Sequence, residues 1–146
     1  MATATTTRNT TVGRMINGAL GGLAGGVVFG AMMGMMGMLP MVASLIKSES
    51  AFVGLGLHMV FSAISGAGYG LVFGNQTTTL QQGLLWGAIY GVIWWVLGPM
   101  ILMPLMMGMG LQFAGSFTAP MLKSLLGHVI YGVIAGAFYA WYSHRR

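Results

Sequence analysis

The sequence predicts an all-α integral membrane protein, a four-helix transmembrane bundle built from a tandemly duplicated helical hairpin. Of the 146 residues, 56% are hydrophobic and only 5% are charged, whereas a soluble domain carries roughly a quarter charged residues. Four apolar stretches are each long enough to supply the roughly 20 residues that a membrane-spanning helix needs. Similar residues also recur at a fixed spacing in the two halves of the chain, and this repetition indicates the duplication.

The first half begins with a polar, threonine-rich segment, residues 1–14, which we expect to be a tail outside the bundle. The first hairpin should then occupy residues 15–74. Its two spans are expected near 16–46 and 52–73, separated by the polar sequence "KSES". The apolar run after Arg14 is too long for a signal peptide, so we expect no cleavage there.

A polar linker at residues 75–82 leads to the second hairpin, which should occupy residues 83–146. Its spans are expected near 83–107 and 121–141, with "GLQFAGSFTAPMLKS" between them. Because each half contains two spans, both ends of the chain should fall on the same side of the membrane.

The composition excludes several classes of site. Glu49 is the only acidic residue, and the chain has no cysteine. A Ser-His-Asp triad, a pair of catalytic carboxylates and a thiolate metal site therefore cannot be assembled, and we expect a protein that is not an enzyme. The six lysines and arginines flank the apolar stretches instead of clustering, which is typical of contact with the lipid bilayer and not with nucleic acid.

A shift of 70 residues brings the second span onto the fourth. It aligns His58 with His128 and Gly66 with Gly136, in the shared pattern H-x-x-[FY]-[SG]-x-x-[SA]-G-x-x-Y. A shift near 65 aligns glycines of the first span with glycines of the third. Because two spans per unit preserve orientation, we expect the halves to be related by a pseudo-two-fold axis along the membrane normal.

Small residues recur on one face of these helices, and the first span has a glycine at every fourth position. Lipid provides no hydrophobic drive between helices, so small residues pack helices by letting their backbones approach closely. The glycines that we expect at helix contacts are Gly18, Gly22, Gly26, Gly30, Gly34, Gly66, Gly83, Gly87, Gly91, Gly132 and Gly136.

Several of these segments together resemble the YagU-like family of bacterial inner-membrane proteins. The segments are "HMVFSAISGAGYG", "QGLLWGAIYGVIWWVLGPMILMPLMMGMG" and "LLGHVIYGV", with the terminal "RR", and they lie within residues 58–146. The chain differs from the family in a short first external loop and in its larger number of methionines. The resemblance implies a bacterial inner-membrane protein with a link to acid tolerance, and it supplies no reaction.

The two histidines of the repeat are the residues most able to bind a ligand. His58 and His128 should each lie roughly 9 Å inside the outer end of their spans, by the rise of a helix. The methionine-rich ends of the other two spans reach the same depth. The candidate ligands at this depth are His58, His128, Met35, Met36, Met38, Met103, Met106 and Met107.

Three interpretations of these residues remain open. Imidazole and thioether groups suit copper, especially Cu(I). Two histidines on opposed helices can instead be axial ligands of heme b, with glycine leaving room for the flat macrocycle. In the third interpretation, each histidine donates a hydrogen bond to a nearby carbonyl, and the methionines fill space against glycine.

The function that the sequence supports best is a small non-enzymatic multi-pass membrane protein. It would be a packing scaffold or an accessory subunit, forming a homo-oligomer or joining a larger membrane complex. A binder or carrier of copper or heme b is the first alternative. A small-solute conduit is the second, although the spans offer few polar residues beyond Ser62 and Ser65.

Both termini are predicted to lie in the cytoplasm, because positive charges favour that side of the inner membrane. Reporter fusions at the two ends should therefore both report a cytoplasmic location, and a terminus found outside would contradict the four-span topology or its orientation. Four cations lie on the side of the termini and two on the opposite side: Arg8, Arg14, Arg145 and Arg146, against Lys47 and Lys123.

Overall fold

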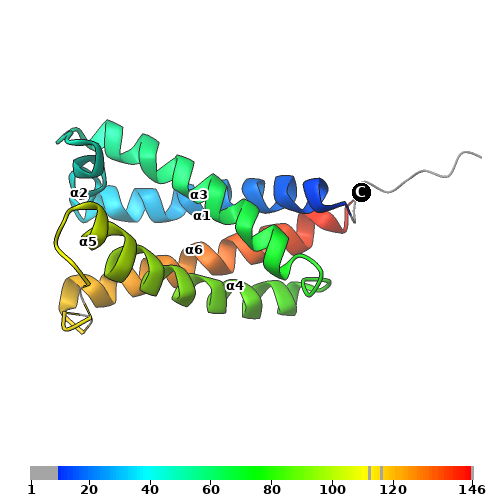
Figure 1. Cartoon of the computed structure of the whole chain (residues 1–146). Coiled ribbons are helices and arrows are strands. Elements are labelled where there is room, and N and C mark those ends of the chain that lie inside the picture. The colour runs from blue at the N-terminus through cyan, green and yellow to red at the C-terminus, as the bar shows by residue number, and fades with distance from the viewer. Residues whose placement is uncertain (1–9, 112, 116, 146) are drawn as a thin grey trace, which may run out of the picture.

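The expected all-α bundle of four apolar helices is confirmed by the computed structural model, which describes residues 10–111, 113–115 and 117–145. Over these residues the chain forms helices and no strand, and four helices are long and apolar enough to cross a membrane. They form a bundle in which the start of α1 and the end of α6 lie at the same end (Figure 1). The four are α1 (Thr11–Met35), α3 (Ala51–Phe73), the segment Leu80–Met106, and α6 (Ala119–Ser143).

The first and third spans, which start with α1 and α4, begin earlier than expected. Their first turns are capped by polar residues that the sequence analysis assigned to the tail and the linker. The Thr10 side chain accepts a hydrogen bond from the Gly13 amide at 3.0 Å. Thr79 and Gln82 form a capping box at the start of α4 (Leu80–Trp95). Such caps satisfy amides that have no partner within the helix. The rest of the expected tail, residues 1–9 with Arg8, lies outside the described residues, as does Arg146.

The first span is shorter than the expected 16–46, because α1 ends at Met35. Gly37 takes the left-handed conformation with a φ of 68°, and the Met38 amide donates to the Met33 carbonyl at 2.9 Å. These contacts form a Schellman motif, which ends the helix through a residue in the left-handed conformation, usually a glycine. The chain then turns through two short helices, α2 (Leu39–Ala43) and η2 (Ser44–Ile46), before α3.

The third span is helical throughout but changes its winding in the middle. After α4 comes a π-helical segment, η3 (Val96–Leu102), and then α5 (Met103–Met106). Pro99 lies inside η3 and has no amide hydrogen to donate. A wider turn is a recognised response of a helix to such a local break in its hydrogen-bond ladder.

Direct backbone contact between glycines closes each hairpin. In the first, a Cβ atom added at Gly22 would lie 2.7 Å from the Cα of Gly66, and one at Gly18 would collide with the Gly66 carbonyl. In the second, a Cβ atom added at Gly83 would collide with the Gly136 carbonyl in the same way. The two hairpins therefore use matching contacts at positions related by the shifts of 65 and 70 residues.

Gly34 is the exception among the expected packing glycines. It is exposed, and an added Cβ would meet only the Leu39 side chain at an ordinary 3.5 Å. The expectation fails at this position because Gly34 lies in the last turn of α1, where no neighbouring backbone comes close. The other ten are buried.

The expected pseudo-two-fold symmetry does not extend to the contacts between the hairpins. Gly21 and Gly25 of α1 press against the backbone of α6, at Ala135 and Tyr131. A two-fold axis would place α4 equally close to α3, but these helices meet near the loop that joins them and diverge toward α2 and α5 (Figure 1). The bundle is therefore closed on one side and open on the other.

Gly22→Leu should unfold the bundle far more readily than Gly34→Leu in the same helix. Leucine at position 22 forces the α1 and α3 backbones apart, which should lower the free energy of unfolding by about 3 kcal/mol, the upper end for overpacked cores. Leucine at the exposed position 34 meets no backbone. Thermal unfolding in detergent measures both, with Val27→Leu on the lipid-facing surface as a second control. Equal stability of the three variants would contradict the close contact.

Candidate functional site

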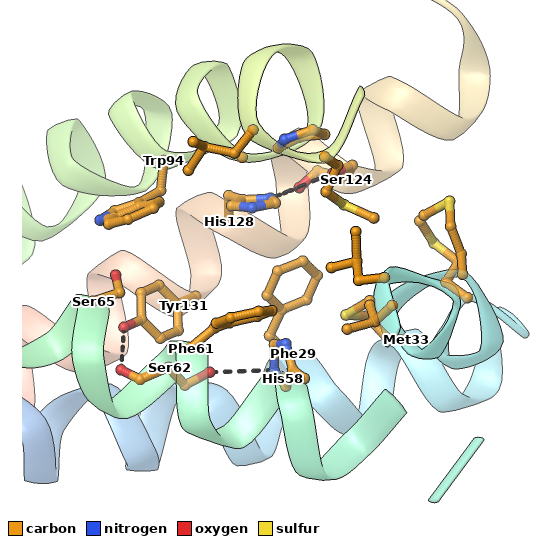
Figure 2. A pocket seen from close by; sticks show the side chains of 18 of the residues that line it. Phe29, Met33, His58, Phe61, Ser62, Ser65, Trp94, Ser124, His128 and Tyr131 are labelled. Carbon is orange, nitrogen blue, oxygen red and sulfur yellow. Dashed lines mark hydrogen bonds between the residues drawn. The ribbon is translucent and has the colours of Figure 1, made fainter. Parts of the chain in front are cut away.

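A pocket of about 250 Å³ lies where α3 and the third span diverge. α1 and α6 form its floor with Phe29 and Tyr131 (Figure 2). Phe61, Ile64 and Leu102 at its edge are 42%, 62% and 45% exposed, so the pocket opens sideways onto the surface that lipid chains would cover. Most of the lining side chains are apolar, two histidines and three serines are polar, and none of the lining residues is Lys, Arg, Asp or Glu.

His58 reaches the pocket from α3 and is held by the first hairpin. Its Nε2 lies 3.0 Å from the carbonyl oxygen of Gly26 in α1. Since a carbonyl can only accept, this nitrogen carries the hydrogen and donates. The Ser62 hydroxyl lies 3.5 Å from the same nitrogen. The neutral ring therefore keeps a lone pair on its other nitrogen, Nδ1.

His128 is held by its own helix and through the opposite nitrogen. Its Nδ1 donates to the carbonyl of Ser124, one turn earlier in α6, at 2.8 Å. The lone pair of the neutral ring is then on Nε2, and this atom faces Gly98 of η3, whose added Cβ would be 3.8 Å away. Both histidines thus have separate carbonyl partners, as the packing interpretation expects.

Phe29 stands between the two histidines (Figure 2). Its ring centroid lies 5.3 Å from that of His58 and 4.9 Å from that of His128, with edge-to-face geometry in both cases. The imidazoles therefore line one pocket without facing each other across an open gap. This arrangement does not match the expected pair of axial heme ligands, because a phenyl ring occupies the space that the macrocycle would need.

The candidate methionines divide into two groups. Met38, Met103 and Met106 line the pocket, whereas Met35 and Met107 are 82% and 45% exposed and do not belong to the lining. Met36 is half-buried outside the lining. Two further methionines that the sequence analysis did not select line the pocket: Met33 and Met41.

The described residues contain no group of three or more His, Asp or Glu side chains placed to hold a metal ion. A copper site would therefore depend on at most two imidazoles with thioethers. The five methionines on the pocket wall come from α1, α2, α5 and the residue before α2, and no geometry among them singles out one ion. The apolar lining of the pocket, and not a set of metal ligands, is therefore the main feature of the site.

Two tyrosine hydroxyls hold α3 to the rest of the bundle at the inner edge of the pocket. Tyr90 of α4 donates to the Ser65 carbonyl at 2.6 Å, and Tyr131 of α6 donates to the Ser62 carbonyl at 2.8 Å. Neither bond was foreseen from the sequence, because the tyrosine pattern alone does not name the carbonyl that is in reach.

Two polar atoms at this end of the pocket have no hydrogen-bond partner. They are the Ser65 hydroxyl oxygen and the Trp94 indole nitrogen, and both are buried. Ser65 comes from α3 and Trp94 from α4, on opposite walls (Figure 2). Ser65 falls on the small-residue face of α3, seven positions after His58, whereas Trp94 gave no signal beyond its position 65 residues after Phe29.

Comparison with the profiles of known protein families, with curated proteins and with solved structures found no match. The resemblance to YagU-like proteins therefore remains a prediction from the residues quoted for it.

Tyr90→Phe and Tyr131→Phe should each loosen α3 from the second hairpin. Each removes one hydroxyl bond to an α3 carbonyl and should lower the free energy of unfolding by about 0.6–1 kcal/mol, as for other polar contacts between membrane helices. Thermal unfolding in detergent measures the loss, and amide hydrogen exchange should become faster in α3 than in α1. Unchanged exchange in α3 would show that these hydroxyls do not hold the helix.

Proposed function

We propose that this chain is a non-enzymatic multi-pass membrane protein that binds a small apolar molecule in the pocket between its hairpins. The observation that carries the proposal is an apolar pocket of about 250 Å³ whose mouth lies on the lipid-facing side. An apolar cavity of about 150 Å³ is enough to hold benzene. The pocket is therefore large enough for a substituted ring, which can enter from the bilayer.

The copper and heme b alternatives have less support. The heme alternative conflicts with the position of Phe29 between the histidines. For copper, the support is limited to single imidazoles near the pocket methionines. A Soret band or stoichiometric copper in the purified protein would favour these alternatives over an organic ligand.

The small-solute conduit has less support still. A path along the bundle would have to pass through the half of the bundle beyond the pocket. Tyr69, Tyr90 and Tyr139 pack together there, with Tyr69 fully buried. These rings fill the interior of that half, where a solute would have to pass.

A packing scaffold or accessory subunit remains the second candidate function. Its support is the rigid glycine contact inside each hairpin, which lets a small chain present a fixed surface to a neighbour. The glycine faces are used inside the chain, so they no longer argue for a homo-oligomer. Association with a larger complex would have to use the exposed apolar surface, and a mass measurement in mild detergent tests it.

We also propose a bacterial inner-membrane location with cytoplasmic termini, within the YagU-like family. The support is the charge distribution and the resemblance given above. At the end with the termini, the Arg145 guanidinium lies 4.1 Å over the Trp141 ring, a pairing suited to a membrane interface. The proposed duplication is supported by the matching glycine contacts of the two hairpins.

Gly98→Leu should block the pocket, whereas Gly56→Leu should not. A Cβ at position 98 meets only His128, so a leucine there extends into the pocket, and a Cβ at the exposed position 56 meets nothing within 4 Å. Binding of tritiated decylbenzene to the protein in lipid nanodiscs should weaken about tenfold or more in Gly98→Leu, since overpacking buried space costs 1–3 kcal/mol.

The control for this test is the nanodisc without protein, whose uptake of decylbenzene is subtracted. Equal binding by the wild type and both variants would show that the probe dissolves only in lipid, and the proposed pocket function would fail. Loss of binding in Gly56→Leu alone would place the site on the outer surface of α3 and overturn the proposal too.

A further inference from the structure

We infer that the ligand of the pocket is a lipid-soluble quinone, whose ring carbonyl accepts hydrogen bonds from Ser65 and Trp94. The inference rests on the proposed function, because it names the ligand class of the same pocket. The chemistry that identifies it is a neutral carbonyl group on a flat ring, with an apolar chain leading back to the bilayer.

The first observation is the unpartnered hydroxyl of Ser65. The residue is 7% exposed and its oxygen makes no hydrogen bond. A serine in a helix can satisfy itself by donating to the carbonyl one turn earlier, and Ser65 does not do so. The other pocket serines, Ser62 and Ser124, each lie against a histidine nitrogen. A buried hydroxyl left without a partner is costly, and lipid supplies no partner either.

The second observation is the indole nitrogen of Trp94, which is also buried without a partner. An indole N–H can only donate, so its partner must be an acceptor. The indole N–H of the neighbouring Trp95 does have a partner, because its Nε1 donates to the Met121 carbonyl at 3.0 Å. The hydroxyls of Tyr131 and Tyr90 lie close to Ser65 and Trp94 respectively, but neither completes a hydrogen bond of ordinary geometry with them. The indole N–H of Trp94 and the hydroxyl of Ser65 can therefore both donate to an acceptor at the same end of the pocket, and one carbonyl oxygen has two lone pairs.

The charge and shape of the pocket restrict the chemical class of the ligand further. No charged side chain lines it, so a carboxylate or a phosphate head group would be buried without a counter-charge, which is strongly unfavourable. Four aromatic side chains contribute to the walls: Phe29, Phe61, Trp94 and Tyr131. Such faces pack against a flat ring by offset or edge contact. A neutral ring with a carbonyl satisfies both conditions.

The opening of the pocket suits the hydrocarbon chain of a quinone, and the histidines suit the hydroxyl group of its reduced form. The mouth between α3 and η3 lets a hydrocarbon chain extend into lipid. On the wall of the pocket, each neutral imidazole keeps one lone pair after donating to its carbonyl. These lone pairs can accept from the hydroxyl of the reduced form, the quinol. The pocket therefore offers donors and acceptors in the same combination that a quinone–quinol pair requires.

The test compares three probes that carry the same ten-carbon chain, each bound to the protein in lipid nanodiscs. Decyl-benzoquinone has the ring and the carbonyl, decylbenzene has the ring alone, and decyl acetate has the carbonyl alone. Decyl-benzoquinone should bind most tightly, by about fivefold for each net hydrogen bond. The chain has no cysteine, so the quinone meets no thiol that would add to it.

Ser65→Ala should weaken decyl-benzoquinone binding about fivefold and leave decylbenzene binding unchanged. Trp94→Phe, which also reduces the aromatic wall, should weaken the binding of both probes, and that of decyl-benzoquinone about fivefold more than that of decylbenzene. Trp86→Phe is the matched control, because Trp86 stacks on Phe73 away from the pocket, and it should change neither. Without a ligand, Ser65→Ala should unfold at the same temperature as the wild type or higher, since it removes an unsatisfied hydroxyl. A serine that only stabilised the fold would not combine weaker quinone binding with an unchanged or higher unfolding temperature when it is replaced.

Several results would overturn the quinone inference while leaving the pocket function intact. These are equal binding of decyl-benzoquinone and decylbenzene by the wild type, equal loss of all three probes in Ser65→Ala, and decyl acetate binding as tightly as decyl-benzoquinone. The last would assign the site to a carbonyl lipid without a ring. Failure of every probe to bind above the empty nanodisc would overturn the inference and the proposed function together.

Discussion

The bundle depends on the direct contact of backbones at glycine, because lipid gives the helices no hydrophobic reason to associate. In each hairpin a Cβ atom on the contact glycines would fall inside the backbone of the partner helix, as at Gly22 against Gly66 and at Gly87 against Gly132. The energy of association then comes from dispersion between closely spaced backbones, which any added side chain would remove. This constraint makes each hairpin a rigid unit, and the remaining features of the structure are consequences of how the two units meet.

The units meet unequally, and the inequality creates the pocket. On its second face α1 carries Gly21 and Gly25, which let α6 approach. At the positions 65 residues later α4 carries Trp86 and Tyr90. The rings of Trp86 and Tyr90 hold α3 away from α4, too far for the two backbones to touch. The Tyr90 hydroxyl spans this distance and donates to the Ser65 carbonyl. Two halves with matching glycine contacts inside them thus leave a gap between them, with Phe29 and Trp94, 65 residues apart, on its walls.

The polar atoms around this gap follow two different rules. Both histidines and two of the serines are arranged so that every imidazole hydrogen meets an oxygen, as membrane interiors demand. Ser65 and Trp94 break that rule with two buried donors on facing walls. Departures from local self-consistency of this kind are typical of functional sites, where stability is given up for recognition. The aromatic and methionine walls supply non-specific affinity for an apolar guest, and the two donors supply selectivity.

The sequence by itself determined the membrane class, the four spans and the glycine faces within each hairpin, and it selected both histidines together with Met38, Met103 and Met106, which line one pocket. These follow from hydrophobic length and from the positions of small residues, which are local properties of each helix. The tertiary structure alone decided the rest. A glycine face indicates close packing without naming its partner, so the α1–α6 contact and the separation of α3 from α4 could not be foreseen. The sequence left open whether the two histidines converge on a ligand. In the bundle each ring donates to a different helix carbonyl, and Phe29 lies between them. The pocket exists only because bulky rings on α4 face α3, and that juxtaposition is a property of the assembled bundle.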